Sequence, residues 1–281
     1  MVRDLINLVV CENTANALSV LLLSNLLEAL KIAGKIPKRI VLQTGGKHYG
    51  VHIGPNMNPM EESDPRYLRE PNFYFSQEDL LWKWAKENGV SWNVTRPAFI
   101  IGAVPEAAMN IALALSLYTI VQKELGQSIE FPGDGIAWAI EKHVTSSRLI
   151  GYHAEWLFKT PETQNEVLNL VDGGQFSYGK FWPVLAALFN TSYEVPKEDD
   201  SAYQTFTMPQ NLPPRGFGPA GSFKLSGSFD AWSVRPEVKA KWAEIKEKYN
   251  LQHRNDPFEN HQDVFGLLDA DLLGNWACSL R

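Results

Sequence analysis

The sequence predicts an α/β fold in which parallel strands alternate with helices that cover the sheet. From the start to about residue 189, short runs rich in β-branched residues alternate with amphipathic stretches, which is the pattern of parallel strands joined by helices. The composition, with 44% hydrophobic and 21% charged residues, is that of an ordinary globular protein. A length of 281 residues allows one large domain or two modest ones.

Strands and helices alternate through the first hundred residues. The predicted elements are, in order, a strand at 5–10, a helix at 15–31, a buried strand at 39–43, a helix at 76–88, and strands at 92–96 and 99–101. A loop rich in Gly, Pro, Asn and Asp spans 47–71, and loops of this length in α/β domains usually serve a function. Ser76 with Asp79 indicates a helix start of the capping-box type, and Asn88-Gly89 indicates its end.

The second half changes character near residue 190. The predicted elements are a helix at 107–125, a strand at 129–131, a helix at 146–158, a strand at 167–171, and helices at 178–189, 236–249 and 264–276. Residues 191–230 are dense in Pro, Gly, Ser and acidic residues without helical or strand period, which indicates a linker or insertion. We therefore expect three parts: 1–190, 191–230 and a mostly helical 231–281.

Charge, hydropathy and cysteine content exclude several classes of protein. A net charge of −6, from 26 basic and 32 acidic side chains, disfavours binding to nucleic acid or to an anionic membrane. The longest apolar stretch, 17–30, is shorter than the roughly 20 residues of a membrane helix and contains polar residues. Cys11 and Cys278 have no metal-ligand spacing, so we predict no metal site. With no apparent signal peptide, a reducing, cytoplasmic location is expected.

Lys47 and Tyr74 are the first candidates for chemistry. Each follows, or lies beyond, the carboxyl end of a predicted strand, where ligands bind in open parallel sheets. A nearby ammonium lowers the pKa of a phenol, which suits a tyrosine that donates a proton to a developing enolate or alkoxide. Spacing alone leaves a second interpretation open, in which Lys47 is a solvated loop residue and Tyr74 a half-buried aromatic.

Several segments resemble one family. They are LQTGGKHYG at 42–50, NFYFSQEDLL at 72–81, and TRPAFIIG at 95–102 followed by Met109-Asn110. These segments are similar to atypical short-chain dehydrogenase/reductases of the progesterone 5β-reductase and iridoid synthase (PRISE-like) family, and most closely to its fungal type. The resemblance covers most of the chain and implies a Rossmann-like parallel sheet with flanking helices.

The resemblance assigns roles to five residues. In this family the motif containing Lys47 supplies the catalytic lysine, and the first tyrosine of the Asn-Phe-Tyr motif, here Tyr74, is the catalytic tyrosine. The segment containing Arg96, Pro97 and Phe99 corresponds to the strand end beside the nicotinamide. NADP(H) is therefore the expected cofactor, and Lys47 is expected to contact its ribose.

The sequence also departs from the family. No G-x-G-x-x-G motif occurs, and the strand at 5–10 aligns with the family's fourth strand, so the glycine-rich N-terminal part and the C-terminal tail are expected to be missing. We then expect an unpaired strand edge beside the apolar helix 15–31, and a homodimer or marginal solubility as its consequence. Phe75 replaces a second tyrosine, which changes the expected pocket shape.

The resemblance implies a reductase of a carbonyl or α,β-unsaturated carbonyl in a small hydrophobic metabolite, in fungal secondary metabolism. Tyr74 would donate the proton and Lys47 would assist it. Two alternatives stay open. One is a non-redox isomerase or cyclase derived from this fold, since proton transfer and electrostatic stabilisation need no hydride. The other is an inactive, truncated relative.

Overall fold

The computed structural model describes residues 12–51, 59–68, 70–104, 110–207, 222–252 and 255–273. The predicted strand at 5–10, both cysteines and Met109 lie outside these residues. The unpaired strand edge expected at 5–10 therefore lies outside them as well.

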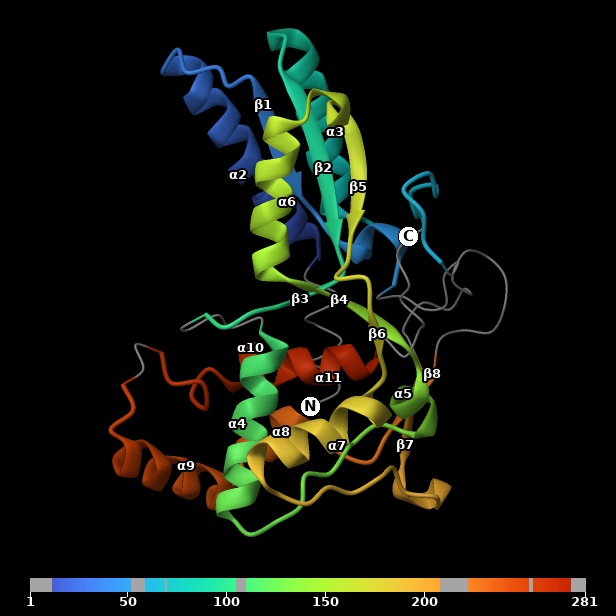
Figure 1. Ribbon diagram of the computed structural model, residues 1–281, viewed down its shortest axis with the longest axis vertical. Helices are drawn as coiled ribbons and strands as arrows, with labels where there is room; N and C mark the ends of the chain where they lie inside the picture. The colour runs from blue at the N-terminus through green and yellow to red at the C-terminus, as the bar shows by residue number, and fades with distance from the viewer. Residues whose placement is uncertain are drawn as a thin grey trace.

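Within the described residues, helices dominate and eight short strands lie between them (Figure 1). The strands are β1 (Arg39–Gln43), β2 (Ser91–Pro97), β3 (Phe99–Ile101), β4 (Lys142–Ser146), β5 (Glu166–Leu170), β6 (Gln175–Phe176), β7 (Gln204–Thr207) and β8 (Ser222–Leu225). The α-helices are α2 (Glu12–Ile32), α3 (Phe73–Asn88), α4 (Ile111–Glu124), α5 (Gly135–Ala139), α6 (Ser147–Lys159), α7 (Tyr178–Phe189), α8 (Phe229–Ser233), α9 (Pro236–Tyr249), α10 (His261–Val264) and α11 (Gly266–Leu273). Single 3₁₀ turns lie at η1 (Gly46–Tyr49), η2 (Pro161–Thr163) and η3 (Asp200–Ala202).

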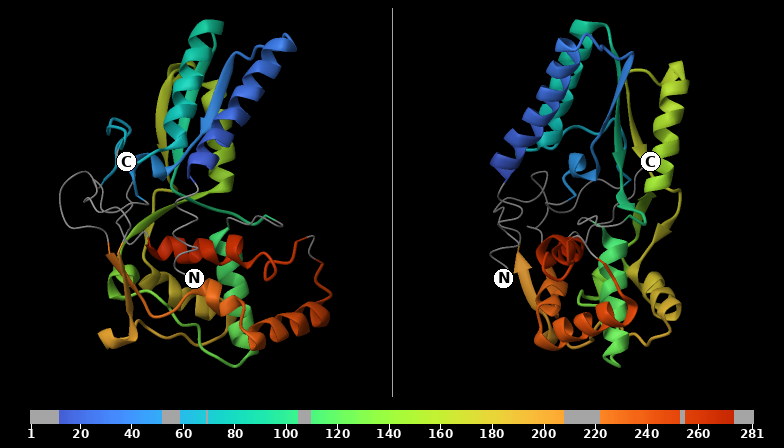
Figure 2. Two further views of the ribbon diagram at one scale, coloured as in Figure 1. Left: turned by 180° about the vertical axis from the view of Figure 1, so that it is seen from behind. Right: turned by 90° about the vertical axis from the view of Figure 1, so that its left-hand side faces the viewer.

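The first part of the structure, here called the sheet half, is a three-layer α/β unit. Its sheet has the order β1-β2-β5, and both pairings are parallel. Helices α2 and α3 cover one face and α6 lies on the other (Figure 2). Leu23 and Leu27 of α2 pack with Trp84 of α3 and with side chains of β1 and β2 in one hydrophobic cluster. The predicted parallel sheet with flanking helices is thus confirmed.

The second part, here called the helical half, consists of α4, α5, α7 to α11 and the β7–β8 hairpin (Figure 1). The carboxyl ends of β1, β2 and β5 point toward it. Its core is one hydrophobic cluster rich in aromatic rings, to which α4 and α7 contribute as much as α9 and α11 do. The predicted boundary near residue 190 therefore does not separate two cores, and the division into three parts stays a prediction.

A small sheet joins the two halves. Strand β3 pairs with β4 in parallel, and β4 pairs with β6 in antiparallel orientation. At the start of β4, the ammonium of Lys142 lies 2.9 Å from an Asp271 carboxylate oxygen on α11, and the Tyr178 hydroxyl donates to the same oxygen. All three side chains are buried. This contact fixes α11 and α7 to the small sheet.

Two helices begin elsewhere than the sequence predicted. Helix α3 begins at Phe73 rather than Ser76, because the side chain of Asn72 accepts a hydrogen bond from the Tyr74 amide and caps the helix. Helix α4 begins at Ile111, because Asn110 caps it in the same way through the Leu113 amide. Asparagine is among the best N-cap residues, and both caps were overlooked in the sequence.

Other predictions of regular structure were wrong. Residues 129–131 form no strand; Ile129 makes an isolated bridge to Tyr193 instead. The segment 191–230 contains the β7–β8 hairpin, whose Phe223 and Leu225 are buried in the helical half. The C-terminal helix is divided into α10 and α11, with α11 beginning at Gly266, a poor helix former. Residues 274–276 of that prediction lie outside the described residues.

Helix α2 exposes a stripe of leucines on the side away from the sheet. Leu22 is 69% exposed, and Leu18, Leu21 and Leu26 are each more than half exposed. An exposed apolar stripe is a typical site of self-association. The predicted homodimer through the N-terminal strand edge beside this helix stays a proposal. Among the described residues, no helix combines the length and hydropathy needed to cross a membrane.

Candidate active site

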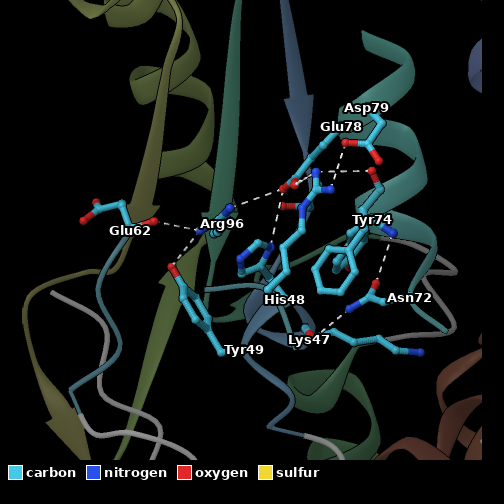
Figure 3. Close-up of polar contacts among 12 residues, drawn as sticks. Lys47, His48, Tyr49, Glu62, Asn72, Tyr74, Glu78, Asp79 and Arg96 are labelled. Atoms are coloured by element: carbon cyan, nitrogen blue, oxygen red, sulfur yellow. Dashed lines mark hydrogen bonds and ion pairs between the residues drawn. The ribbon is translucent and has the colours of Figure 1, made fainter. Parts of the chain in front are cut away.

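The candidate site lies at the carboxyl edge of the parallel sheet. Strand β1 ends at Gln43 and leads through Gly45 into the turn η1, which carries Lys47. Helix α3 places Tyr74 in its first turn. Asn72 joins the two segments: its side-chain nitrogen donates to the Lys47 carbonyl at 3.0 Å, and its oxygen accepts from the Tyr74 amide at 3.0 Å (Figure 3). One capping residue thus sets the position of both predicted catalytic residues.

The Tyr74 hydroxyl lies against the ends of β1 and β2. A Cβ added to Gly45 would be 3.4 Å from this hydroxyl and 3.5 Å from the Pro97 carbonyl oxygen, so both groups border the same glycine. Burial raises the pKa of Tyr74 above its ordinary value of 10.0. The lowering of this pKa by Lys47 that was predicted from the sequence is therefore wrong in direction. The phenol is therefore protonated at neutral pH and can act as a proton donor.

Lys47 lies beside the first turn of α3. Its ammonium is 5.5 Å from the centroid of the Phe73 ring, within cation–π range. Its side chain points away from the buried charges around Glu78 (Figure 3). Lys47 is half-buried at the sheet edge, and its ammonium is a group that can donate a hydrogen bond to a hydroxyl or an anionic oxygen.

The other three predicted site residues differ in position. Arg96 is buried, and its guanidinium contacts Glu78 at 3.3 Å and the Tyr49 hydroxyl at 3.1 Å, so this side chain serves the interior of the sheet half. Pro97 presents its carbonyl oxygen near Gly45. Phe99, in β3, is 37% exposed. Contact of these residues with a cofactor stays a prediction.

A buried charge cluster that was not predicted from the sequence lies behind the site. Glu78, one turn after Tyr74 on α3, has no exposed surface. Its carboxylate lies 2.8 Å from the Arg66 guanidinium, 3.3 Å from Arg96 and 3.5 Å from His48 (Figure 3). A charged residue four positions after Tyr74, on the helix face that also carries Leu81 and Trp84, was the available signal.

At neutral pH, Glu78 is ionised and His48 is neutral, because the pKa of each is lowered. Burial by itself raises the pKa of Glu78, but contact with His48 and the positive charges of Arg96 and Arg66 outweigh burial and lower that pKa. Burial lowers the pKa of His48 despite the nearby carboxylate. The counter-charges of Glu78 at neutral pH are therefore the two guanidiniums.

Phe75 belongs to this cluster. It is buried, its ring meets that of His48 edge-on at 5.1 Å, and the Arg66 guanidinium lies 5.1 Å from its centroid. The effect of Phe75 on pocket shape that the resemblance predicted therefore concerns the interior, where a phenol in its place would need a hydrogen-bond partner.

The fold and the site together define a Rossmann-type protein with a tyrosine and a lysine at the carboxyl edge of its sheet. The family model of the PRISE-like Rossmann-fold domain matches residues 12–208. The chain therefore belongs to the PRISE-like Rossmann-fold family, as the resemblance predicted.

Relatives are similar over 59–86% of this chain. Short chain dehydrogenase gsfE of Penicillium aethiopicum is 35% identical over 168 residues, which are 59% of this chain and 45% of gsfE. The (S)-8-oxocitronellyl enol synthase CYC2 of Camptotheca acuminata is 36% identical over 179 residues, which are 61% of this chain and 46% of the synthase. An uncharacterised protein of Schizosaccharomyces pombe is 30% identical over 260 residues, 86% of this chain and 62% of that protein. The chain thus spans about half the length of most of these relatives.

A solved structure shows the same fold at low identity. RMD from Pseudomonas aeruginosa, solved in complex with NADPH, superposes with a TM-score of 0.53 and 20% identity, over 64% of this chain and 59% of RMD. This similarity supports the Rossmann fold, and the predicted fold class is confirmed.

Proposed function

We propose that this chain carries the proton-donating part of a short-chain-dehydrogenase-type active site, which acts with NADPH on a carbonyl or α,β-unsaturated carbonyl of a small hydrophobic metabolite. The observation that carries the proposal is the protonated Tyr74 hydroxyl at the carboxyl edge of the sheet, joined through Asn72 to the segment of Lys47. The enol synthases among the relatives are named for an enol product, which is what results when an enolate oxygen takes a proton.

The described residues at the sheet edge suit the nicotinamide end of such a cofactor. Gly45 adds no side chain between the ends of β1 and β2, so backbone borders the edge directly. Lys47 would donate hydrogen bonds to the ribose, and Pro97 and Phe99 would line the nicotinamide side. Arg96 would contribute through its backbone, because its guanidinium is paired with Glu78 and Tyr49. The bound nicotinamide would supply a hydride.

The chain's own residues would supply the proton and the positive field. Tyr74 would donate its proton to the substrate oxygen as negative charge develops there. The half-buried ammonium of Lys47 would stabilise this charge, since preorganised charges are more effective in a site from which water is excluded. A substrate without strong charge fits best, because both groups recognise one oxygen and leave the remainder to apolar contact.

The test is a product analysis of the purified chain with a panel of enals, enones and ketones, with and without NADPH. We expect consumption of NADPH together with a reduced product, and loss of both in the Tyr74→Phe variant. A rearranged product that forms without NADPH would support the isomerase or cyclase alternative instead. No product under either condition, from a folded sample, would contradict both.

A further inference from the structure

We infer that Glu78 is a positioning residue of the Tyr74–Lys47 site: its buried carboxylate holds together the three segments that carry the site residues. This inference rests on the proposed function for its catalytic consequence. Its structural part, the placement of Tyr74 by Glu78, has a readout of its own.

The contacts of Glu78 reach one neighbour in each segment. His48 directly follows Lys47, Arg96 directly precedes Pro97, and Glu78 itself lies one helical turn after Tyr74. One carboxylate oxygen of Glu78 lies 3.3 Å from Arg96 and 3.5 Å from His48, and the other accepts from Arg66 at 2.8 Å. The carboxylate therefore contacts the neighbours of the site residues in η1 and β2, and Glu78 acts on a reaction through them.

The network continues from Arg96 to the rest of the sheet edge. The same guanidinium donates to the Tyr49 hydroxyl in η1 at 3.1 Å, and that hydroxyl donates to the Asn169 side chain in β5 at 2.6 Å. Tyr49 is fully buried, and the Arg96 guanidinium lies 5.3 Å from the centroid of its ring. The Tyr49 hydroxyl thus connects the turn that carries Lys47 to Arg96 of β2 and to Asn169 of β5. The counter-ion of Arg96 in this network is Glu78.

Because Arg96 is buried, its charge depends on the Glu78 carboxylate. The Arg96 guanidinium is tolerated in the interior because the Glu78 carboxylate compensates it, and removal of the carboxylate leaves Arg96 buried without its counter-charge. The segments of the cluster would then have to move to give Arg96 access to water or to another acceptor. Since His48 and Lys47 are consecutive residues, a movement of this turn displaces the ammonium.

The closing experiment compares Glu78→Gln with Asp79→Asn. Glutamine keeps the size of the side chain and removes its charge. Asp79 is the matched control, because it is adjacent, 60% exposed and paired with the same Arg66 at 2.8 Å, but within the described part of the chain it contacts neither Arg96 nor His48. If Glu78→Gln fails to fold, Arg66→Gln replaces it, since that change removes one of the carboxylate's three contacts at a partly exposed position.

Two measurements are made on each variant. The first is NMR of protein labelled at the Cζ carbon of its nine tyrosines, with the Tyr74 signal assigned as the one absent from Tyr74→Phe. The second is the steady-state rate with NADPH and the substrate found above, well below the unfolding temperature. In Glu78→Gln we expect a displaced Tyr74 signal and a fall in kcat of at least about tenfold with KM changed less than about threefold. We expect Asp79→Asn to match the wild type in both.

The outcomes separate this inference from the proposed function. An unchanged Tyr74 signal and unchanged kcat in folded Glu78→Gln would overturn the positioning role. Equal effects of Glu78→Gln and Asp79→Asn would also overturn it, because they would show that the loss of either carboxylate beside Arg66 has the same effect, without the contacts of Glu78 with Arg96 and His48. A displaced Tyr74 signal in Glu78→Gln, together with a wild-type protein that turns over no substrate, would support positioning by Glu78 and contradict the proposed function.

Discussion

Tyr74 reaches the sheet edge because its helix begins one residue before it. The Asn72 side chain accepts a hydrogen bond from the Tyr74 amide and donates one to the Lys47 carbonyl. The residue that caps the helix therefore also links the two candidate catalytic segments. Burial raises the pKa of the phenol. At the scale of single residues, the account therefore requires a tyrosine that acts as an acid and stays protonated over the physiological range.

This requirement gives a prediction for the pH dependence of turnover. The protonated phenol is the active form, so the rate falls as pH rises through its pKa. Because that pKa lies above 10.0, we expect kcat to be flat from about pH 7 to about pH 9 and to fall only above about pH 10. Tyr74→Phe should lower kcat at least about tenfold at pH 7 while the unfolding temperature stays unchanged.

The measurement is a kcat profile over pH for the wild type and for Tyr74→Phe, with unfolding monitored by circular dichroism. An alkaline limb with a midpoint near neutral pH would contradict the account, because it would mean that Lys47 lowers the pKa of the phenol as the sequence suggested. Unchanged turnover in Tyr74→Phe would remove Tyr74 from the mechanism.

At the scale of elements, a buried carboxylate joins α11 to α8. Asp269 of α11 has no exposed surface and accepts hydrogen bonds from the Ser228 hydroxyl and from the amides of Phe229 and Asp230 at the start of α8. Burial raises the pKa of Asp269 to about 6, although these hydrogen bonds oppose the shift. The folded protein therefore holds this proton more tightly than the unfolded chain does.

The sign of the stability effect follows from this difference. Between about pH 4 and pH 6 the native state binds more protons at Asp269 than the unfolded state, so the free energy of unfolding falls as pH rises through this window. A shift of about two pKa units corresponds to a loss on the order of 3 kcal/mol. Stability from this group is complete below about pH 4 and lost above about pH 6.

We expect Asp269→Asn to remove this decline. Urea unfolding at a series of pH values should give a wild-type free energy that falls relative to Asp269→Asn between about pH 4 and pH 6. Asp263→Asn, at an exposed position of the neighbouring helix α10, is the control and should follow the wild type. Parallel curves for the wild type and Asp269→Asn would show that Asp269 is ionised throughout this range.

The elements also show where sequence patterns suffice. Strands β1 and β2 and helices α7 and α9 were predicted to within a residue, because each has a clear apolar period and a stop signal nearby. Helix α3 was misplaced because two capping signals compete, and the contact of Asn72 with the distant Lys47 carbonyl favours Asn72. The hairpin β7–β8 was missed because its buried side chains, Phe223 and Leu225, pack against helices that follow it and precede it in the chain.

At the scale of the whole molecule, the same contrast applies to the site. Lys47 and Tyr74 were identified because each lies in a short contiguous motif that resembles a known family. The cluster of Glu78, Arg96 and His48 was missed because its members are 18 to 48 residues apart in the sequence and only the fold brings them together. Burial lowers the pKa of His48, and contacts with His48, Arg96 and Arg66 lower the pKa of Glu78 against the effect of burial. No local sequence pattern reports either burial or these contacts.

The two halves of the molecule meet where the strands of the sheet end. The carboxyl edge that carries Tyr74 and Lys47 points toward the helical half, and β3, β4 and β6 connect the two (Figure 1). Ligands of open α/β sheets bind beyond this edge. Binding of a nicotinamide cofactor there is the central claim, because reductase chemistry requires it. The claim most needs a test because the sequence contains no G-x-G-x-x-G turn to hold the pyrophosphate.

The most direct test is a calorimetric titration of the purified 281-residue chain with NADPH, alongside the Lys47→Ala variant. The account predicts a dissociation constant in the micromolar range for the wild type and binding weakened at least about tenfold, or about 1.4 kcal/mol, in Lys47→Ala. No heat of binding at millimolar NADPH, from a sample that circular dichroism shows to be folded, would contradict the central claim.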